Sequence, residues 1–526
     1  MQTVAHATFA PEPEVHLVNA FKDPYDTIVA TARSCYSSKV ISPEDVSKDE
    51  EAKARRDRIA ESIYKAGHHT TIQHATFQFV LEKVSRQFIW SFLHSHPFYN
   101  SEQVSQRYVE VKPEHFMVPP IEGEAREIYI TACRRLTEVY QLLIQLVEPT
   151  VQWEYRRIFP LRPFEEKRWA SAIKKRAQEV ARYILPVATH AHLYHTISAI
   201  TLFRYNRLCE LFDTPLEQRI VIRKMMDEVR TLDPEMLKLA EDPLPIEETP
   251  EYQLFHSLQA GPRREYTSAF LKEFDASLEG RISKLVDYKV HSEENMAQAV
   301  RSVLGLPKTA MSDSQAIDLV LNPARNRYFA EALNVTTHGK LTRTMVHPHF
   351  TFRKKLSHTA DSQDQRHRMT PASRPIMACQ FLPEQPDFIV PILIDRTPEA
   401  LDLYNEAMKE TWGAIRRLVE LGVSNEFVMY LLPNAFPVRF EESGDLLNLH
   451  HKWTKRLCYT AQEEIWAACR EEVMQVAQVS PNLAKYIAAP CTLRRQAGET
   501  PFCPEGDRFC GIPVWKLPVA EYQRLL

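Results

Sequence analysis

The chain has 526 residues, of which 44% are hydrophobic and 25% charged, and its net charge is −3 at pH 7. This length exceeds one ordinary core, so we expect two domains, and the near-neutral charge argues against nonspecific nucleic-acid binding. No apolar run is long enough for a bilayer, the first residues lack a signal-peptide pattern and nine cysteines do not make a disulfide framework; we therefore expect a cytoplasmic protein that binds no nucleic acid and no membrane.

In chain order, the pattern predicts an α+β protein with long helices and few strands. An alternating strand follows His74, and long helices are expected at 124–148, 176–211 and 215–240. A second alternating strand follows His347, before helices at 398–421, 424–432 and 445–478. The strands and helices do not alternate as they would in a doubly wound sheet.

Three features occur twice in the same order, which predicts a tandem duplication with a period of about 250 residues. Each half has a histidine followed by a Phe-x-Phe strand, then a polar histidine segment, then a helix that ends at Leu-Pro. A proline- and acid-rich stretch separates the halves and is typical of a linker. We therefore predict domains at 1–240 and 266–526, a linker at 241–265, and an insertion at about 150–175 in the first copy.

The polar segment of the second half, Arg366-His367-Arg368, predicts an anion-binding site. Adjacent guanidinium groups repel one another unless an anion lies between them, and their planar forks fit phosphate or carboxylate. A solvated basic loop is the alternative. Glycine is scarce, at 12 residues, and no glycine-rich phosphate loop is present, so phosphates would be held by arginine and hydroxyl side chains.

These motifs resemble the flavin-dependent (alternative) thymidylate synthases, whose signature is Arg-His-Arg followed by Ser-x-Arg-Tyr, downstream of a His-x-x-Phe-Thr-Phe strand. The first half keeps the serine-arginine-tyrosine end at Ser105–Tyr108, but its Arg-His-Arg is replaced by His94-Ser95-His96. The second half keeps Arg366-His367-Arg368, and its continuation is shortened to Ser373-Arg374. The resemblance implies two tandem copies of this fold, a mixed sheet with long helices.

The resemblance also implies an enzyme that transfers a methylene group from methylenetetrahydrofolate to dUMP and forms dTMP, with FAD as cofactor and NADPH as reductant. It implies a catalytic role for Arg456, which would stabilise negative charge on the carbonyl edge of the uracil ring. Its implied cofactor-binding residues are His68, Thr70, Arg366, His367 and Arg368. Its implied substrate-binding residues are Ser105, Gln106, Arg107, Tyr108, Ser373, Arg374 and Arg439.

Because the motif losses in the two copies are complementary, and this family builds its sites at subunit interfaces, we expect composite sites in a homodimer of tandem chains. Two alternatives stay open. The chain could be a non-catalytic flavin- or nucleotide-binding relative, or a related flavin enzyme acting on another pyrimidine-like substrate. The substitution of the family's Asn-Ala-Arg by Asp445-Leu446-Leu447 motivates both.

The C-terminal cysteines, Cys491, Cys503 and Cys510, do not have a standard zinc spacing. A fourth ligand could come from Cys458 or His451. The spacing favours reduced, structural cysteines over a metal site, and we predict no metal at the active site.

Overall fold

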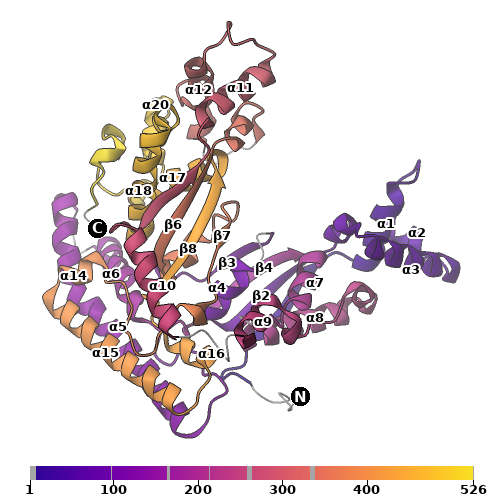
Figure 1. Ribbon diagram of the computed structural model, residues 1–526, viewed down its shortest axis with the longest axis horizontal. Helices are drawn as coiled ribbons and strands as arrows, with labels where there is room; N and C mark the ends of the chain where they lie inside the picture. Colours follow the sequence, from indigo (N-terminus) through magenta and orange to yellow (C-terminus); the bar gives the residue numbers. More distant parts are fainter. Residues whose placement is uncertain are drawn as a thin grey trace. The chain divides into compact units, whose positions relative to one another are not determined.

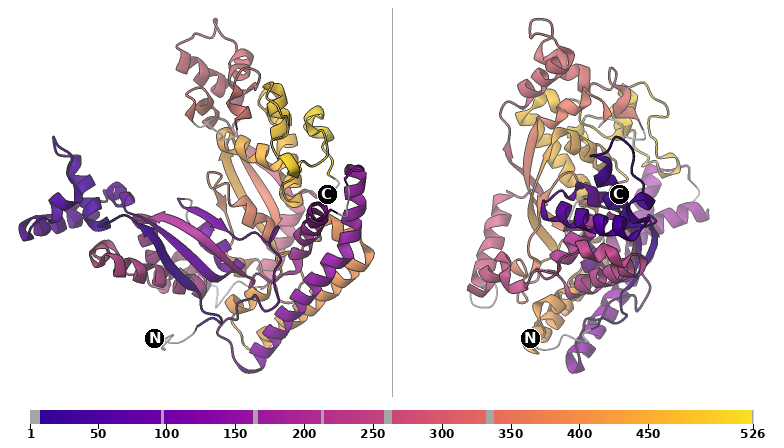
Figure 2. Two further views of the ribbon diagram at one scale, coloured as in Figure 1. Left: turned by 180° about the vertical axis from the view of Figure 1, so that it is seen from behind. Right: turned by 90° about the vertical axis from the view of Figure 1, so that its right-hand side faces the viewer.

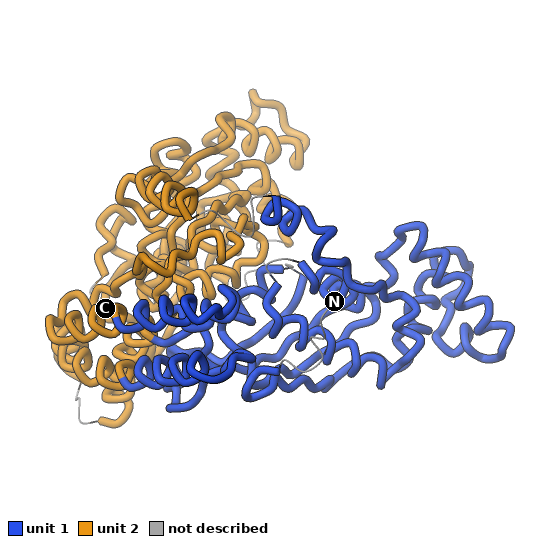
Figure 3. Tube along the Cα trace, turned by 60° about the horizontal axis from the view of Figure 1, so that its bottom comes forward, with its two compact units in different colours: residues 1–138, 185–263, 410–432 blue, residues 139–184, 264–409, 433–526 orange. Residues whose placement is uncertain are grey.

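The computed structural model describes residues 8–95, 98–162, 166–211, 214–257, 264–331, 338–524 and 526. The chain forms two compact units, each assembled from separate stretches (Figure 3). Unit 1 contains residues 1–138, 185–263 and 410–432, and unit 2 contains residues 139–184, 264–409 and 433–526. His96, part of the degenerate motif of the first copy, lies outside the described residues.

The two units have the same sheet topology (Figure 1). Unit 1 has the order β1-β2-β4-β3, formed by β1 (Glu14–Ala20), β2 (Thr76–Ser85), β3 (Asn100–Gln103) and β4 (His190–Ser198). Unit 2 has the order β5-β6-β8-β7, formed by β5 (Ser283–Tyr288), β6 (His349–Ser357), β7 (Ala372–Ser373) and β8 (Pro437–Asp445). The predicted α+β class is confirmed, but the strand pairs of both sheets are antiparallel, so the sheets are not mixed.

In each unit, several helices pack on the sheet (Figure 2). The helices assigned to unit 1, or beginning in it, are α1 (Pro24–Ser34), α2 (Pro43–Ser47), α3 (Glu50–Lys65), α4 (Arg86–His94), α5 (Gly123–Ile158), α7 (Ala199–Arg207), α8 (Leu216–Leu232), α9 (Pro250–Ser257) and α16 (Asn425–Val428). Those assigned to unit 2, or beginning in it, are α6 (Lys167–Ala181), α10 (Arg264–Ser277), α11 (Ser292–Leu304), α12 (Asp313–Leu321), α13 (His358–Asp364), α14 (Ile392–Asp395), α15 (Pro398–Glu420), α17 (Leu446–Arg456), α18 (Glu463–Val479), α19 (Pro481–Ala484) and α20 (Pro490–Gln496). None of the described helices is long and apolar enough to cross a membrane.

Two predicted long helices are wrong, because the structure divides one range by a strand and the other into two α-helices. The range 176–211 holds the end of α6, a 3₁₀ turn, all of β4 and then α7. In β4 the buried residues alternate with more exposed ones, a period of two that the helix prediction missed. The range 445–478 holds α17 and α18, separated by a short loop.

The helix that ends at Leu-Pro in each copy belongs to the unit built mainly from the other copy. Residues 139–184 of the first half lie in unit 2, and residues 410–432 of the second half lie in unit 1. The unit boundaries fall inside α5 and α15, which therefore each contribute to both units. The predicted copy boundaries at 240 and 266 describe the repeat in the sequence and stay a prediction.

This exchange creates the same buried group of hydrogen bonds in both units, a glutamate that accepts from three donors, which we call a node. In unit 1, Glu217 accepts hydrogen bonds from the backbone and hydroxyl of Ser85, at 2.7 and 2.5 Å, and from the Tyr430 hydroxyl at 2.9 Å. Each node thus joins a capping serine and a glutamate of one copy to a tyrosine of the other copy.

In unit 2, Glu464 accepts from the backbone and hydroxyl of Ser357 and from the Tyr183 hydroxyl, the last at 2.7 Å. Burial raises the pKa of Glu464, and likewise that of Glu217 in unit 1, to about 7. The carboxyl groups are fully enclosed, which explains why each needs three donors. These hydrogen bonds hold each tyrosine, and the segment that carries it, in the core of the unit built mainly from the other copy.

Candidate functional site

The Arg366-His367-Arg368 loop of unit 2 follows α13 and is held by the last residue of α17. Arg456 donates from Nε to His367 Nε2 at 2.9 Å and from a terminal nitrogen to the Gln363 carbonyl at 2.8 Å. Arg366 is exposed, while His367 and Arg368 are half-buried. The structure therefore brings two of the predicted site residues, Arg456 and His367, into direct contact.

The contact with Arg456 fixes the protonation of His367. Because His367 Nε2 accepts a hydrogen bond, its proton lies on Nδ1 and the ring is neutral. Burial lowers the pKa of His367 well below its ordinary value, and the charges of Arg456 and Lys452 lower it further. His367 therefore offers an N–H donor at Nδ1 over the whole physiological pH range.

A buried ionic cluster lies in unit 2 beside this loop. Lys354 Nζ contacts Glu472 at 2.8 Å, Glu442 at 2.9 Å and Asp364 at 3.2 Å. Lys452 Nζ contacts Glu442 at 2.6 Å and Asp364 at 2.8 Å. Their side chains are at most 1% exposed, so two ammonium groups share three carboxylates away from water.

The pKa values of the cluster follow from these contacts. Burial by itself would lower the pKa of Lys354, but the carboxylates of Asp364, Glu442 and Glu472 raise it well above its ordinary value. Burial would raise the pKa of Asp364, yet Lys354 and Lys452 hold it well below its usual range. Lys354 is therefore protonated and Asp364 is ionised, although both are buried.

Unit 1 has apolar or aromatic residues at every position of this cluster. The strand registers and the capping serines align the two units. In this alignment Leu81 replaces Lys354, Phe92 replaces Asp364, His195 replaces Glu442, Tyr205 replaces Lys452 and Met225 replaces Glu472. All five of these unit 1 side chains are buried. Their rings pack directly, with Phe92 centred 4.7 Å from both His195 and Tyr205. In the same alignment Ser95 replaces His367 and Cys209 replaces Arg456, so unit 1 lacks this loop's chemistry.

Sequence reasoning missed the ionic cluster. A signal was available, because Lys354 lies on the same strand face as Phe350 and Phe352, where both phenylalanines are fully buried. A lysine in register with buried phenylalanines requires buried carboxylate partners. The partners themselves come from three distant segments, and no spacing in the sequence identifies them.

The second copy's Ser373-Arg374 occupies a different position from Ser105-Gln106-Arg107. Strand pairing places Ser373 opposite Glu441, and the corresponding residue in unit 1 is Glu102, opposite Tyr194. Arg374 therefore corresponds to Gln103. Its guanidinium donates to Asp361 at 2.8 Å and lies 4.4 Å from the centre of the Phe440 ring.

Arg439 lies on the opposite face of the unit 2 sheet from Arg374. The Arg374 guanidinium lies against the ring of Phe440, the next residue in β8. Side chains of successive strand residues point to opposite faces of the sheet. Arg439 is buried and is bound by Asp275 at 2.7 Å and Asp387 at 2.9 Å. The structure thus separates Arg439 from the Arg456–His367 pair and neutralises its charge.

The predicted site residues of unit 1 occupy two surface segments. His68 and Thr70 are exposed, at the start of a short 3₁₀ helix, His69–His74, which precedes β2. Gly67, just before it, has φ +74°, a conformation that favours glycine. These residues present polar groups to solvent at the end of the long central strand.

The second segment is a turn after β3. The Ser105 carbonyl accepts from the backbone of Tyr108 at 3.2 Å and of Val109 at 3.0 Å, and the Ser105 hydroxyl accepts from the backbone of Arg107 at 3.3 Å. Gln106 is buried, and the Arg107 guanidinium lies 5.5 Å from the Tyr108 ring centre. Ser105 therefore shapes the turn that carries Arg107.

The family model described as thymidylate synthase complementing protein matches residues 16–235 and again residues 284–482. The chain belongs to this family. The resemblance predicted from the motifs is confirmed, and the two matched ranges fit a tandem repeat. The ranges also coincide with the two four-stranded sheets and the helices packed on them.

Relatives in the thymidylate synthase complementing protein family carry the name flavin-dependent thymidylate synthase. The chain is 25% identical over 228 residues to the one from Clostridium tetani, covering 43% of this chain and 85% of the relative. It is 28% identical over 237 residues to the one from Nitratidesulfovibrio vulgaris, covering 44% of this chain and 84% of the relative. A solved UMP/dUMP methylase, PolB from Streptomyces cacaoi, is 19% identical with a TM-score of 0.29, covering 43% of this chain and 94% of that one.

Proposed function

We propose that this chain is a flavin-dependent thymidylate synthase, which converts dUMP to dTMP with methylenetetrahydrofolate and FAD. Family membership over both copies supports the reaction class. The observation that carries the proposal is the Arg456–His367 pair of unit 2, which joins the intact Arg-His-Arg motif to a fixed guanidinium. The reaction needs a fixed positive charge and a neutral donor beside the pyrimidine, and this pair provides both.

In this proposal Arg456 stabilises the negative charge that develops on the carbonyl edge of the uracil ring. A guanidinium held by two hydrogen bonds requires no reorganisation as charge develops, which is the condition for electrostatic catalysis. Negative charge on the carbonyl oxygens makes C5 of the ring nucleophilic. His367, neutral and with its proton on Nδ1, would orient a ring edge by donating one hydrogen bond.

The residues around the loop fit an FAD cofactor, because its pyrophosphate requires guanidinium partners and Arg366 is exposed on the loop surface. Arg366 and Arg368 would hold the phosphates, and His68 and Thr70 of the first copy would contact the flavin. The flavin supplies the hydride. The protein's share is to bind, orient and exclude water.

For the dUMP phosphate, Arg107 is a stronger candidate than Arg439. Two carboxylates already bind Arg439, and moving them away would leave buried charges unpaired. Arg107 lies in an ordered turn with Ser105, whose hydroxyl accepts a hydrogen bond from the Arg107 backbone. Gln106, Tyr108, Ser373 and Arg374 would complete the substrate contacts.

We further propose that a working site needs both copies, in a homodimer of tandem chains. Unit 1 has Ser95 and Cys209 where unit 2 has His367 and Arg456, whereas the serine-arginine-tyrosine segment is complete only in the first copy. The test compares Arg107→Ala with Arg366→Ala for flavin content and dUMP binding. If both variants kept wild-type values for both quantities, composite sites would be refuted; sedimentation equilibrium tests the dimer.

Tritium release from C5-labelled dUMP, with methylenetetrahydrofolate and NADPH, tests the activity. A purified protein with flavin absorbance should release tritium, and Arg456→Ala should release far less. Lys455→Ala is the matched control, because Lys455 is the exposed neighbour on the same helix and keeps the Arg456 contacts. A flavin-loaded wild-type protein that released no tritium would refute the proposal and favour a non-catalytic relative.

A further inference from the structure

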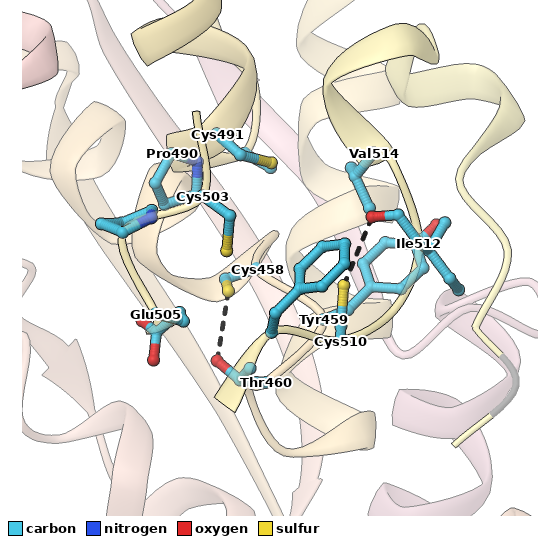
Figure 4. A pocket seen from close by; sticks show the side chains of 13 residues that line it. Cys458, Tyr459, Thr460, Pro490, Cys491, Cys503, Glu505, Cys510, Ile512 and Val514 are labelled. Atoms are coloured by element: carbon cyan, nitrogen blue, oxygen red, sulfur yellow. Dashed lines mark hydrogen bonds between the residues drawn. The ribbon is translucent and has the colours of Figure 1, made fainter. Parts of the chain in front are cut away.

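Four cysteines of unit 2 line one small pocket near the C-terminus (Figure 4). Cys458 follows α17, Cys491 lies in α20, and Cys503 and Cys510 lie in the irregular tail. The cavity has a volume of about 20 Å³, which is close to the space of one water-sized sphere. Nothing in the proposed reaction uses these thiols.

We propose that Cys458, Cys491, Cys503 and Cys510 bind one Zn²⁺ ion as a closed structural site. Four thiolates in a tetrahedral arrangement are the ligand set of structural zinc, and soft sulfur ligands select zinc over hard cations. A cavity of about 20 Å³ suits a single ion. The structure also decides which fourth ligand completes the set, because Cys458 lines the pocket while the alternative, His451, packs 6.0 Å from the His367 ring.

The turn after Cys510 is built for a close approach. Gly511 has φ +82°, and a Cβ there would lie 2.1 Å from Ile158 Cγ2 and 2.7 Å from the Phe159 ring. Only glycine therefore allows the Cys510 turn to pack against the end of α5. This packing holds the backbone of the Cys510 turn beside the end of α5.

The tail gains a cross-link that it otherwise lacks. Residues 497–526 contain no described strand or α-helix, only short 3₁₀ turns at Gly506–Arg508, Val514–Lys516 and Val519–Glu521. Irregular segments of this length are uncommon in compact domains without a specific stabilising element. A metal bound by Cys503 and Cys510 would join this tail to α20 and to the end of α17, two residues after Arg456.

Metal binding would require the cysteine side chains to rotate. No three of the four sulfur atoms in this described pocket lie within 4.8 Å of one another, whereas zinc–sulfur bonds of 2.3 Å place tetrahedral ligands about 3.8 Å apart. In Figure 4 the Cys510 side chain is turned toward the Ile512 carbonyl, to which it donates at 3.6 Å. Binding of the ion would turn such side chains into the cavity that the four cysteines line.

The test is metal analysis of the purified full-length chain by mass spectrometry. We expect one zinc per chain, lost in Cys503→Ser and in Cys510→Ser, and kept in the matched controls Cys35→Ser and Cys379→Ser, whose cysteines lie outside the pocket. No stoichiometric metal, zinc kept in both pocket variants, or iron with inorganic sulfide would each overturn the proposal.

Alkylation of the wild-type protein provides a measurement that requires no variant. In the protein as purified, the four pocket cysteines should resist iodoacetamide while exposed Cys35 reacts, and a strong chelator should make all four reactive without altering Cys35. Equal protection before and after chelation, or a disulfide between any two of the four, would refute a metal site.

Discussion

The exchange of helices between the two copies predicts that a substitution in the second half weakens the core of the first. Tyr430→Phe removes the donor at 2.9 Å from Glu217 and leaves all other contacts of the ring in place. A hydrogen bond to a charged, buried group contributes about 1.5–3 kcal/mol. Because burial raises the pKa of Glu217 to about 7, the carboxyl is ionised at pH 8, where the loss should be greatest.

Hydrogen exchange followed by mass spectrometry at pH 8 measures this effect locally. A loss of 1.5–3 kcal/mol corresponds to roughly 10- to 150-fold faster exchange through local opening. For Tyr430→Phe the acceleration should occur in peptides containing Ser85 and Glu217, whereas Tyr183→Phe should accelerate peptides around Glu464. If Tyr430→Phe accelerated exchange around Glu464 and left Glu217 unchanged, the assignment of the exchanged helices would be wrong.

Three further predictions concern unit 2. Between pH 4.5 and 7 the folded state binds the Glu464 proton and the unfolded state releases it, so the free energy of unfolding falls with rising pH. In urea titrations over this range, the wild-type protein should lose about 3 kcal/mol of stability relative to Glu464→Gln. Parallel pH dependences of the two proteins would contradict the pKa of about 7 for Glu464. Arg456→Lys keeps the charge but loses the fork, so turnover should fall about 10- to 100-fold with flavin retained, and unchanged turnover would exclude a role for the guanidinium geometry. Lys354→Met leaves three buried carboxylates with one lysine and should cost about 3–5 kcal/mol in urea unfolding; a cost below 1 kcal/mol would show that the cluster is not ionised.

The repeated motifs made the duplication and the family predictable, because the histidine with its Phe-x-Phe strand, the polar histidine segment and the Leu-Pro helix recur in the same order in both halves. The strand β4 was missed, since its alternation lies directly between two helical patterns with no glycine to mark the boundaries. The Arg456–His367 contact also could not be predicted from the sequence. It joins residues 89 positions apart, and only the packing of α17 against the loop after α13 brings them together.

The two units provide a comparison of the same core with and without buried charge. Buried ion pairs are often replaceable by apolar side chains without loss of stability, and unit 1 contains such a replacement in the packed rings of Phe92, His195 and Tyr205. Stability alone therefore does not account for the ionic cluster of unit 2. The cluster lies beside the loop that carries His367, and Lys452 is one of the charges that keep this histidine neutral. Because the cluster occurs in the unit that carries Arg456, we propose that its buried charges serve the electrostatics of the Arg456–His367 pair.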